Sequence, residues 1–132
     1  MRKGIAAVVV AGVLFSGWLV HARYKARLAE SRTAQAKRDA AYQLVLAQFH
    51  RDVQLRMPRS GVKKYLDLKQ VQYSEWEWNI RTKIGEDPGD GFTCDRWGVY
   101  IDFHFEPVQV QTEPSEFDHL SGIAITKIGH CL

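Results

Sequence analysis

The sequence predicts an α+β protein: an N-terminal transmembrane helix and helical stalk, then a two-layer domain of helices packed on a three-stranded antiparallel sheet. Three observations support this fold class. An uncharged apolar segment continues into a stretch of helix-favouring composition without Pro or Gly. Farther along, the apolar residues alternate with polar ones, as in half-buried strands. The chain has 132 residues and only two cysteines, which limits it to one such domain and excludes a disulfide-dense miniprotein.

The apolar segment covers residues 4–20 and follows two basic residues. At about 1.5 Å rise per residue its helix spans about 25 Å, slightly less than a typical hydrocarbon core. One interpretation is a retained signal anchor, with Arg23, Lys25 and Arg27 in the headgroup region. The other is a signal peptide that is cleaved after Ala22 and releases a secreted protein.

The chain divides into three predicted parts: a signal anchor or signal peptide over 1–22, a basic helical stalk over 23–40 and a small α+β domain over 41–132. Residues 41–55 carry one apolar helical stripe and should pack on the domain. Pro58 breaks this helix, and a short second helix, Gly61–Leu68, follows with Ser60 as its cap.

Three strands complete the domain. Alternation from Trp76 to Ile84 and from Trp97 to Phe105 predicts two strands, and three isoleucines at Ile123–Ile128 mark a third. The Gly- and Asp-rich segment Gly85–Gly91 is predicted as a loop. Because no helical crossover lies between the strands, the sheet should be antiparallel, with one face covered by the helices.

Cys94 precedes the second predicted strand and Cys131 follows the last one. If these strands are antiparallel neighbours, the two thiols meet and form a disulfide, which implies an oxidising compartment. The count of basic residues flanking the apolar segment favours the opposite, cytoplasmic orientation of the domain. We favour the external orientation on the strength of the cysteines.

Charge is segregated along the chain. Residues 21–64 hold eleven Lys and Arg against three acids, whereas residues 65–132 hold five against twelve. The basic part either binds anionic headgroups beside the membrane or is a solvated helix face. Nucleic-acid binding is not expected, because the aromatic residues that would stack on bases lie in the acidic half.

No sequence motif indicates catalysis, a cofactor or a metal site. We therefore predict a protein that is not an enzyme, with no cofactor and no metal. A small hydrolase that uses Asp102, His104 or His119 remains a lower alternative.

Two tryptophans at alternate positions, Trp76 and Trp78, follow Tyr73. They are predicted to belong to the core. If their face is uncovered, the three aromatic residues are a candidate partner surface, because Trp and Tyr dominate the energetics of protein interfaces.

Two family resemblances carry further expectations. From Phe49 to the C-terminus, the helix, the segment Pro58–Val62, the short helix with Tyr65-Leu66 and the three strands resemble small uncharacterised bacterial membrane-anchored α+β proteins. They are also distantly similar to the domain of outer-membrane assembly lipoproteins, although no lipid-attachment cysteine stands near the N-terminus.

The second resemblance is to type IV pilins and pseudopilins. It rests on the basic leader, the apolar segment that continues into one long helix, the antiparallel sheet and the late cysteine pair. Gly4 would precede the processed residue Ile5, but Val9 stands where the pilin pattern has a glutamate.

These observations predict a non-enzymatic module tethered to the bacterial inner membrane by one span, with its domain in the periplasm or outside the cell. Its partners are the membrane and another envelope protein. A pilin- or pseudopilin-like structural subunit is the alternative, followed by a secreted inhibitor or immunity-like protein. The oligomeric state stays open.

Overall fold

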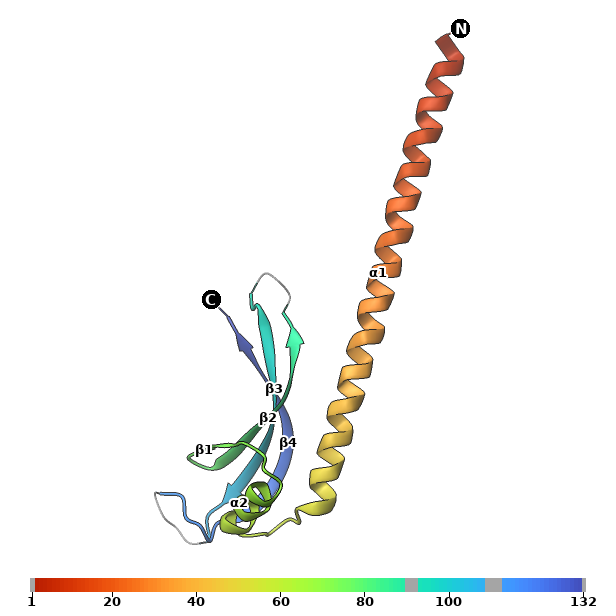
Figure 1. Cartoon of the computed structure of the whole chain (residues 1–132). Coiled ribbons are helices and arrows are strands. Elements are labelled where there is room, and N and C mark those ends of the chain that lie inside the picture. Colours follow the sequence, from red (N-terminus) through yellow and green to blue (C-terminus); the bar gives the residue numbers. More distant parts are fainter. Residues whose placement is uncertain (1, 90–92, 109–112, 132) are drawn as a thin grey trace. The chain divides into compact units, whose positions relative to one another are not determined.

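The computed structural model describes residues 2–89, 93–108 and 113–131, with side chains from Trp18 onwards. Within them the elements follow in the order α1 (Arg2–Asp52), α2 (Arg59–Leu68), β1 (Ser74–Trp76), β2 (Asn79–Pro88), β3 (Arg96–Glu106) and β4 (His119–His130) (Figure 1). The chain divides into two compact units, Met1–Arg38 and Asp39–Leu132. The α+β class, with a long first helix, a short second helix and an antiparallel sheet, is confirmed.

The first unit is helical, since α1 begins at Arg2 and continues beyond Arg38. Its side chains from Trp18 to Ala34 are all exposed, which fits a composition rich in Ala, Arg and Lys. Among the described residues, no helix combines the length and the apolar character needed to cross a membrane. The predicted span at 4–20 lies mostly where side chains fall outside the described residues, so it stays a prediction.

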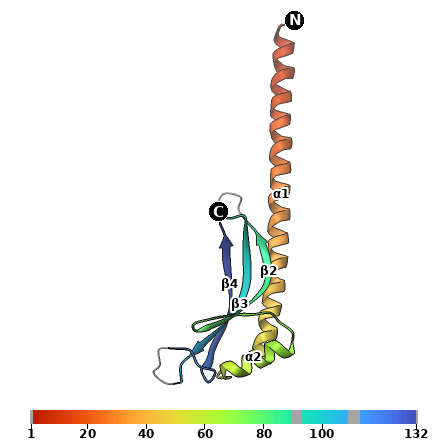
Figure 2. The same ribbon diagram turned by 60° about the vertical axis from the view of Figure 1, so that its left-hand side comes forward.

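The sheet has four antiparallel strands in the order β1-β2-β3-β4, so the prediction of three strands is wrong. Figure 2 shows β2, β3 and β4 side by side. The additional strand is β1, which pairs with the start of β2 from Ser74↔Arg81 to Trp76↔Asn79. A two-residue turn therefore interrupts the segment that alternation predicts as one strand. The alternation is preserved on both sides of this turn, and it does not mark the reversal.

β2 and β4 continue several residues beyond the ends that the sequence predicts. The loop expected from Gly85 begins only after Pro88, because pairing with β3 continues from Gly85↔Val99 to Pro88↔Arg96. A bulge between Lys83 and Gly85 shifts the register and admits the glycine, whose missing side chain leaves room for the Tyr42 ring. β4 covers His119–His130 rather than the isoleucine segment alone.

α2 begins at Arg59, earlier than predicted, and Pro58 occupies the N-cap position without a side-chain cap. Ser60 lies inside the helix, so its predicted capping role is wrong. Proline suits the start of a helix because its fixed φ is helix-compatible and its missing N–H needs no partner there. As a consequence, Arg59 lies in the first helical turn and its side chain is buried.

The core of the second unit lies between one face of the sheet and residues 39–52 of α1 together with α2. The predicted stripe is confirmed, since Tyr42 and Phe49 of α1 are buried, and so is Val53 directly after the helix. The Phe49 ring meets Phe103 edge-on, with ring centroids 5.3 Å apart. Fully buried side chains of this layer come from α2, β2 and β3: Val62, Leu66, Ile80, Val99, Ile101 and Phe103.

A polar network also joins α1 to the sheet within this unit. Lys127 of β4 donates hydrogen bonds to Asp87 of β2 at 2.7 Å and to Asp39 of α1 at 3.0 Å. The Tyr42 hydroxyl donates to Asp87 at 3.2 Å. These hydrogen bonds raise the pKa of Lys127 above its ordinary value. The ammonium of Lys127 is therefore directed toward the helix-covered face of the sheet.

Candidate functional site

The three aromatic residues of the predicted partner surface lie around the β1–β2 hairpin. Trp76 is the last residue of β1 and 59% exposed, so its predicted place in the core is wrong. Trp78 lies in the turn and is half-buried, while Tyr73 packs partly against the core. Burial and a hydrogen bond with Asp67 raise the pKa of Tyr73. The structure thus brings the three residues to one hairpin, with different degrees of exposure.

The turn of this hairpin consists of Glu77 and Trp78, and neither is a glycine or has a positive φ. Two-residue hairpin turns normally use positive φ angles, because that geometry matches the twist of the strands. Here the three carbonyl groups around the turn are instead bound by other parts of the domain. Phe105 N–H donates to the Trp78 carbonyl at 2.8 Å, and Arg59 binds the other two.

Arg59 is the residue that fixes the hairpin. Its guanidinium donates to the Glu77 carbonyl at 3.0 Å and to the Trp76 carbonyl at 3.1 Å. The residue is 3% exposed and its guanidinium stands 5.3 Å from the centre of the Phe105 ring. A buried arginine that bonds two turn carbonyls holds the turn in one conformation. Sequence reasoning missed this role, because nothing in the segment Pro58–Gly61 distinguishes it from an exposed turn.

An acidic side chain neutralises the buried arginine. Glu75 of β1 accepts a hydrogen bond from Arg59 at 3.3 Å and forms an ion pair with Lys63 at 3.0 Å. Partial burial raises the pKa of Glu75, but the hydrogen bond and charge of Lys63 and the charge of Arg59 together lower it by more. The pKa of Glu75 is therefore below its ordinary value. Lys63 also binds Glu116 at 2.9 Å. The hairpin is therefore tied to α2 by charged as well as backbone contacts.

Arg81 supports the exposed tryptophan from the neighbouring strand. Its guanidinium lies 5.7 Å from the Trp76 ring centre and 5.6 Å from that of Tyr100. The same group makes two hydrogen bonds with Asp102, at 2.6 and 2.8 Å. Burial raises the pKa of Asp102, but hydrogen bonds from Arg81 and Thr126 lower it to below its ordinary value. We call Tyr73, Trp76, Trp78 and Arg81 the hairpin surface.

Of the residues of the hydrolase alternative, Asp102 and His104 stand two positions apart on β3, and each is engaged by another side chain. The carboxylate of Asp102 is engaged by Arg81, and His104 hydrogen-bonds Asn79 at 2.7 Å. His119 stands at the start of β4, opposite Glu106. In the segments that the structure describes, no group of three or more His, Cys, Asp or Glu could hold a metal ion. The predictions of no enzyme activity and no cofactor stay predictions.

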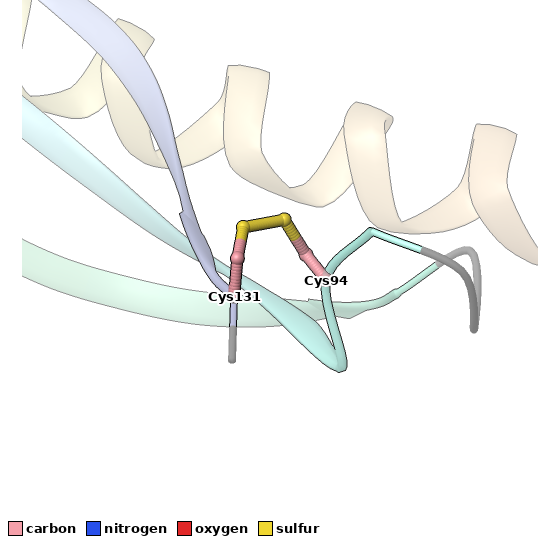
Figure 3. Close-up of a disulfide and its surroundings, with 2 residues drawn as sticks. All are labelled: Cys94 and Cys131. Carbon is pink, nitrogen blue, oxygen red and sulfur yellow. A yellow bond between two sulfur atoms is a disulfide. The ribbon is translucent and has the colours of Figure 1, made fainter.

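The predicted disulfide is confirmed. Cys94, just before β3, and Cys131, directly after β4, are bonded across a sequence separation of 37 (Figure 3). Gly129 packs under the bridge, since a Cβ there would stand 2.8 Å from the Cys94 sulfur. The antiparallel register brings the two ends together, because Arg96 pairs with His130. Structural disulfides persist in oxidising compartments, so the bond indicates an extracytoplasmic domain.

The predicted membrane-proximal residues lie on α1 in the first unit. Arg23, Lys25 and Arg27 are exposed, and so are Trp18 and Tyr24. Two arginines, Arg23 and Arg27, lie beside Tyr24 around one shallow hollow of the helix surface. Aromatic and basic side chains in this combination are typical of the membrane–water interface.

The chain was compared with protein-family models, with curated proteins and with solved structures, and none of the three comparisons gave a match.

Proposed function

We propose that this protein is a non-enzymatic module tethered to the bacterial inner membrane, whose α+β domain binds another envelope protein through the hairpin surface. The observation that carries the proposal is the state of Trp76, which is exposed to solvent and yet held in place. Its indole N–H donates to the Ser74 hydroxyl at 3.3 Å, and its ring contacts Arg81. Its backbone carbonyl is bound by the buried Arg59.

A fixed, exposed tryptophan is suited to binding. Trp, Tyr and Arg are the residues that most often dominate interface energetics. A side chain that is already ordered loses little conformational entropy when a partner covers it, so more of the buried area contributes to affinity. A buried arginine and an ion pair fix the geometry of this hairpin. A solvent-exposed turn that binds no partner does not require such a fixed geometry.

The tether rests on the N-terminal part of the chain. The uncharged segment at 4–20 supplies the span, and Trp18, Arg23, Lys25 and Arg27 supply an interfacial belt. The disulfide favours placing the second unit in the periplasm, or outside the cell if the leader is cleaved. The basic residues then lie close to the anionic headgroups, where each contributes about 1 kcal/mol of attraction.

Site-directed photo-crosslinking in intact cells tests the binding surface. A photo-reactive amino acid at Glu77, next to Trp76, should give one dominant adduct with an envelope protein. Trp76→Ala in the same chain should abolish that adduct, whereas Phe117→Ala, which removes another exposed aromatic side chain, should leave it intact. The proposal fails if the adduct survives Trp76→Ala, or if a photo-reactive group at the exposed Leu68 captures the same protein.

A pilin- or pseudopilin-like structural subunit is a second candidate, favoured by one observation. α1 is a single helix from Arg2 to Asp52, and its last part supplies Phe49 to the core of the domain. A spine of this kind, followed by a four-stranded antiparallel sheet and a late disulfide, is similar to the pilin architecture.

Sequencing the mature N-terminus separates the candidates. A start at Met1 supports the signal anchor, and a start at Ile5 supports processing of the pilin type. A start at Arg23 would contradict both, since it would show a secreted protein without a tether.

A further inference from the structure

The exposed surface of α1 carries a hollow directly after the apolar segment at 4–20. Its volume is about 270 Å³, and it is lined by Val20, Arg23, Tyr24 and Arg27. These residues lie three or four positions apart, so they share one face of the helix. Val20 is also the last residue of the apolar segment, and this part of α1 is drawn in orange-red in Figure 1. The hollow therefore begins where the apolar segment ends.

The two arginines of this hollow keep their charge available for a ligand. Within the described part of the chain, no carboxylate binds Arg23 or Arg27, and both side chains are exposed. The next acid along the same face is Glu30, three residues after Arg27, and no ion pair between these two is present in the described residues. Arginine binds phosphate through two parallel hydrogen bonds, so two guanidinium groups one helical turn apart can share the oxygens of one phosphate group.

The other two lining residues favour a lipid over a free anion. Val20 and Tyr24 are 68% and 60% exposed, and they give the hollow an apolar side. A free phosphate ion gains nothing from apolar surface, whereas the glycerol and acyl carbons of a phospholipid cover it. Tyrosine is also typical of the depth at which lipid headgroups meet the hydrocarbon core.

We propose that this hollow binds one anionic phospholipid, whose phosphate is held by Arg23 and Arg27 and whose glycerol region packs on Val20 and Tyr24. The site rests on the membrane tether of the proposed function, and it differs from diffuse attraction because one lipid occupies one face of α1. None of the lining residues is an acid that could receive an ammonium group. The hollow should therefore select phosphatidylglycerol, whose negative charge is uncompensated, over the zwitterionic phosphatidylcholine.

Lys25 provides the matched control. It lies between the two arginines along α1, and at about 100° of rotation per residue it falls on the opposite side of the helix. It therefore carries the same charge at the same depth but does not line the hollow. Diffuse attraction to the headgroups predicts equal effects of Lys25→Gln and Arg27→Gln. A discrete site predicts that the arginine substitution has the larger effect.

Native mass spectrometry of the full chain in detergent micelles tests the proposal, with phosphatidylglycerol or phosphatidylcholine added as the probe. The first phosphatidylglycerol should bind the wild type more tightly than phosphatidylcholine by about tenfold or more. Arg23→Gln and Arg27→Gln should each weaken the binding of phosphatidylglycerol by about fivefold or more, and Lys25→Gln should weaken it by less than about twofold.

The possible outcomes separate this site from the tether. After reconstitution, the chain should float with phosphatidylcholine vesicles on a density gradient, and failure to float would overturn the tether and the lipid site together. A chain that floats but binds the two lipids equally would overturn the lipid site alone. Equal losses in Lys25→Gln and Arg27→Gln, or displacement of the bound lipid by millimolar inorganic phosphate, would also overturn the lipid site.

Discussion

The two edges of the sheet are stabilised in different ways. β1 has three residues and depends on α2, because the buried Arg59 binds the turn carbonyls and Glu75. β4 has 12 residues, depends on its long ladder with β3, and is fastened at its two ends by the disulfide and by the backbone bonds of Arg56 and Met57. The difference shows that a short edge needs side-chain support, whereas a long one can leave its outer side free.

Breaking the covalent end of β4 should have the largest effect. The double substitution Cys94→Ser with Cys131→Ser should lower the free energy of unfolding by about 3–4 kcal/mol, since the bridge closes a long loop in the unfolded chain. Chemical denaturation measures this value. Adding reductant to the wild type should reproduce it and should not affect the variant. A loss below about 1 kcal/mol would show that pairing with β3 alone secures β4.

Removing the support of β1 should have the next largest effect. Arg59→Met leaves the carbonyls of Trp76 and Glu77 without their donor, and hydrogen bonds from a charged group contribute about 1.5–3 kcal/mol. We expect a loss of about 2–3 kcal/mol and a change in tryptophan fluorescence as the hairpin loosens. Lys63→Met is the matched control, because it removes only the more exposed ion pairs and should cost below about 1 kcal/mol. Equal losses in the two variants would contradict the special role of Arg59.

The contacts of Arg59 also explain why the sequence predicts some elements of the fold and not others. Alternation predicts the central strands and the apolar stripe predicts the packed face of α1, because both follow from the periodicity of the local sequence. The cysteine positions predict the disulfide, because antiparallel neighbours bring the start of one strand to the end of the other. β1 was missed because the turn at Glu77-Trp78 contains none of the usual turn residues. Tertiary contacts stabilise that turn instead, from the Arg59 guanidinium and from the Phe105 N–H.

A similar limit applies to the segment from Gly85 to Pro88, whose composition is typical of a loop. It forms the end of β2 because Asp87 finds Lys127 and Tyr42, which are distant in the sequence. The partner surface could be predicted as a set of aromatic residues. The exposure of each aromatic residue could not be predicted, because it depends on the position of that residue relative to the turn between β1 and β2.

A smaller effect should come from the ion pair in the middle of the sheet, where Asp102 of β3 binds Arg81 of β2 and Thr126 of β4. These contacts hold the pKa of Asp102 below the ordinary value of 3.8 despite its burial. Its carboxylate therefore stabilises the fold above that value, and the contribution is lost as pH falls through the lower pKa of the folded state. Asp102→Asn should cost about 1.5 kcal/mol at neutral pH.

The same variant should flatten the acid side of the curve of stability against pH. The alkaline side serves as the control, because the pKa of Lys127 is raised and its contribution is lost only as pH rises through that higher value. Denaturation series at acid, neutral and alkaline pH measure both sides. An unchanged acid side in Asp102→Asn would mean that other carboxylates determine acid unfolding.

The smallest effect on stability should come from the residue with the largest proposed role in binding. Trp76→Ala should change the free energy of unfolding by less than about 1 kcal/mol, because the ring is mostly exposed and the substitution removes its contact with Arg81 and one exposed hydrogen bond to Ser74. Its effect on partner capture should be a loss of most of the adduct, since a central tryptophan commonly contributes about 2 kcal/mol or more to an interface. Measuring both quantities on one variant separates packing from recognition. A large loss of stability would show that Trp76 supports the hairpin rather than a partner, and the hairpin surface would then lack its proposed binding residue.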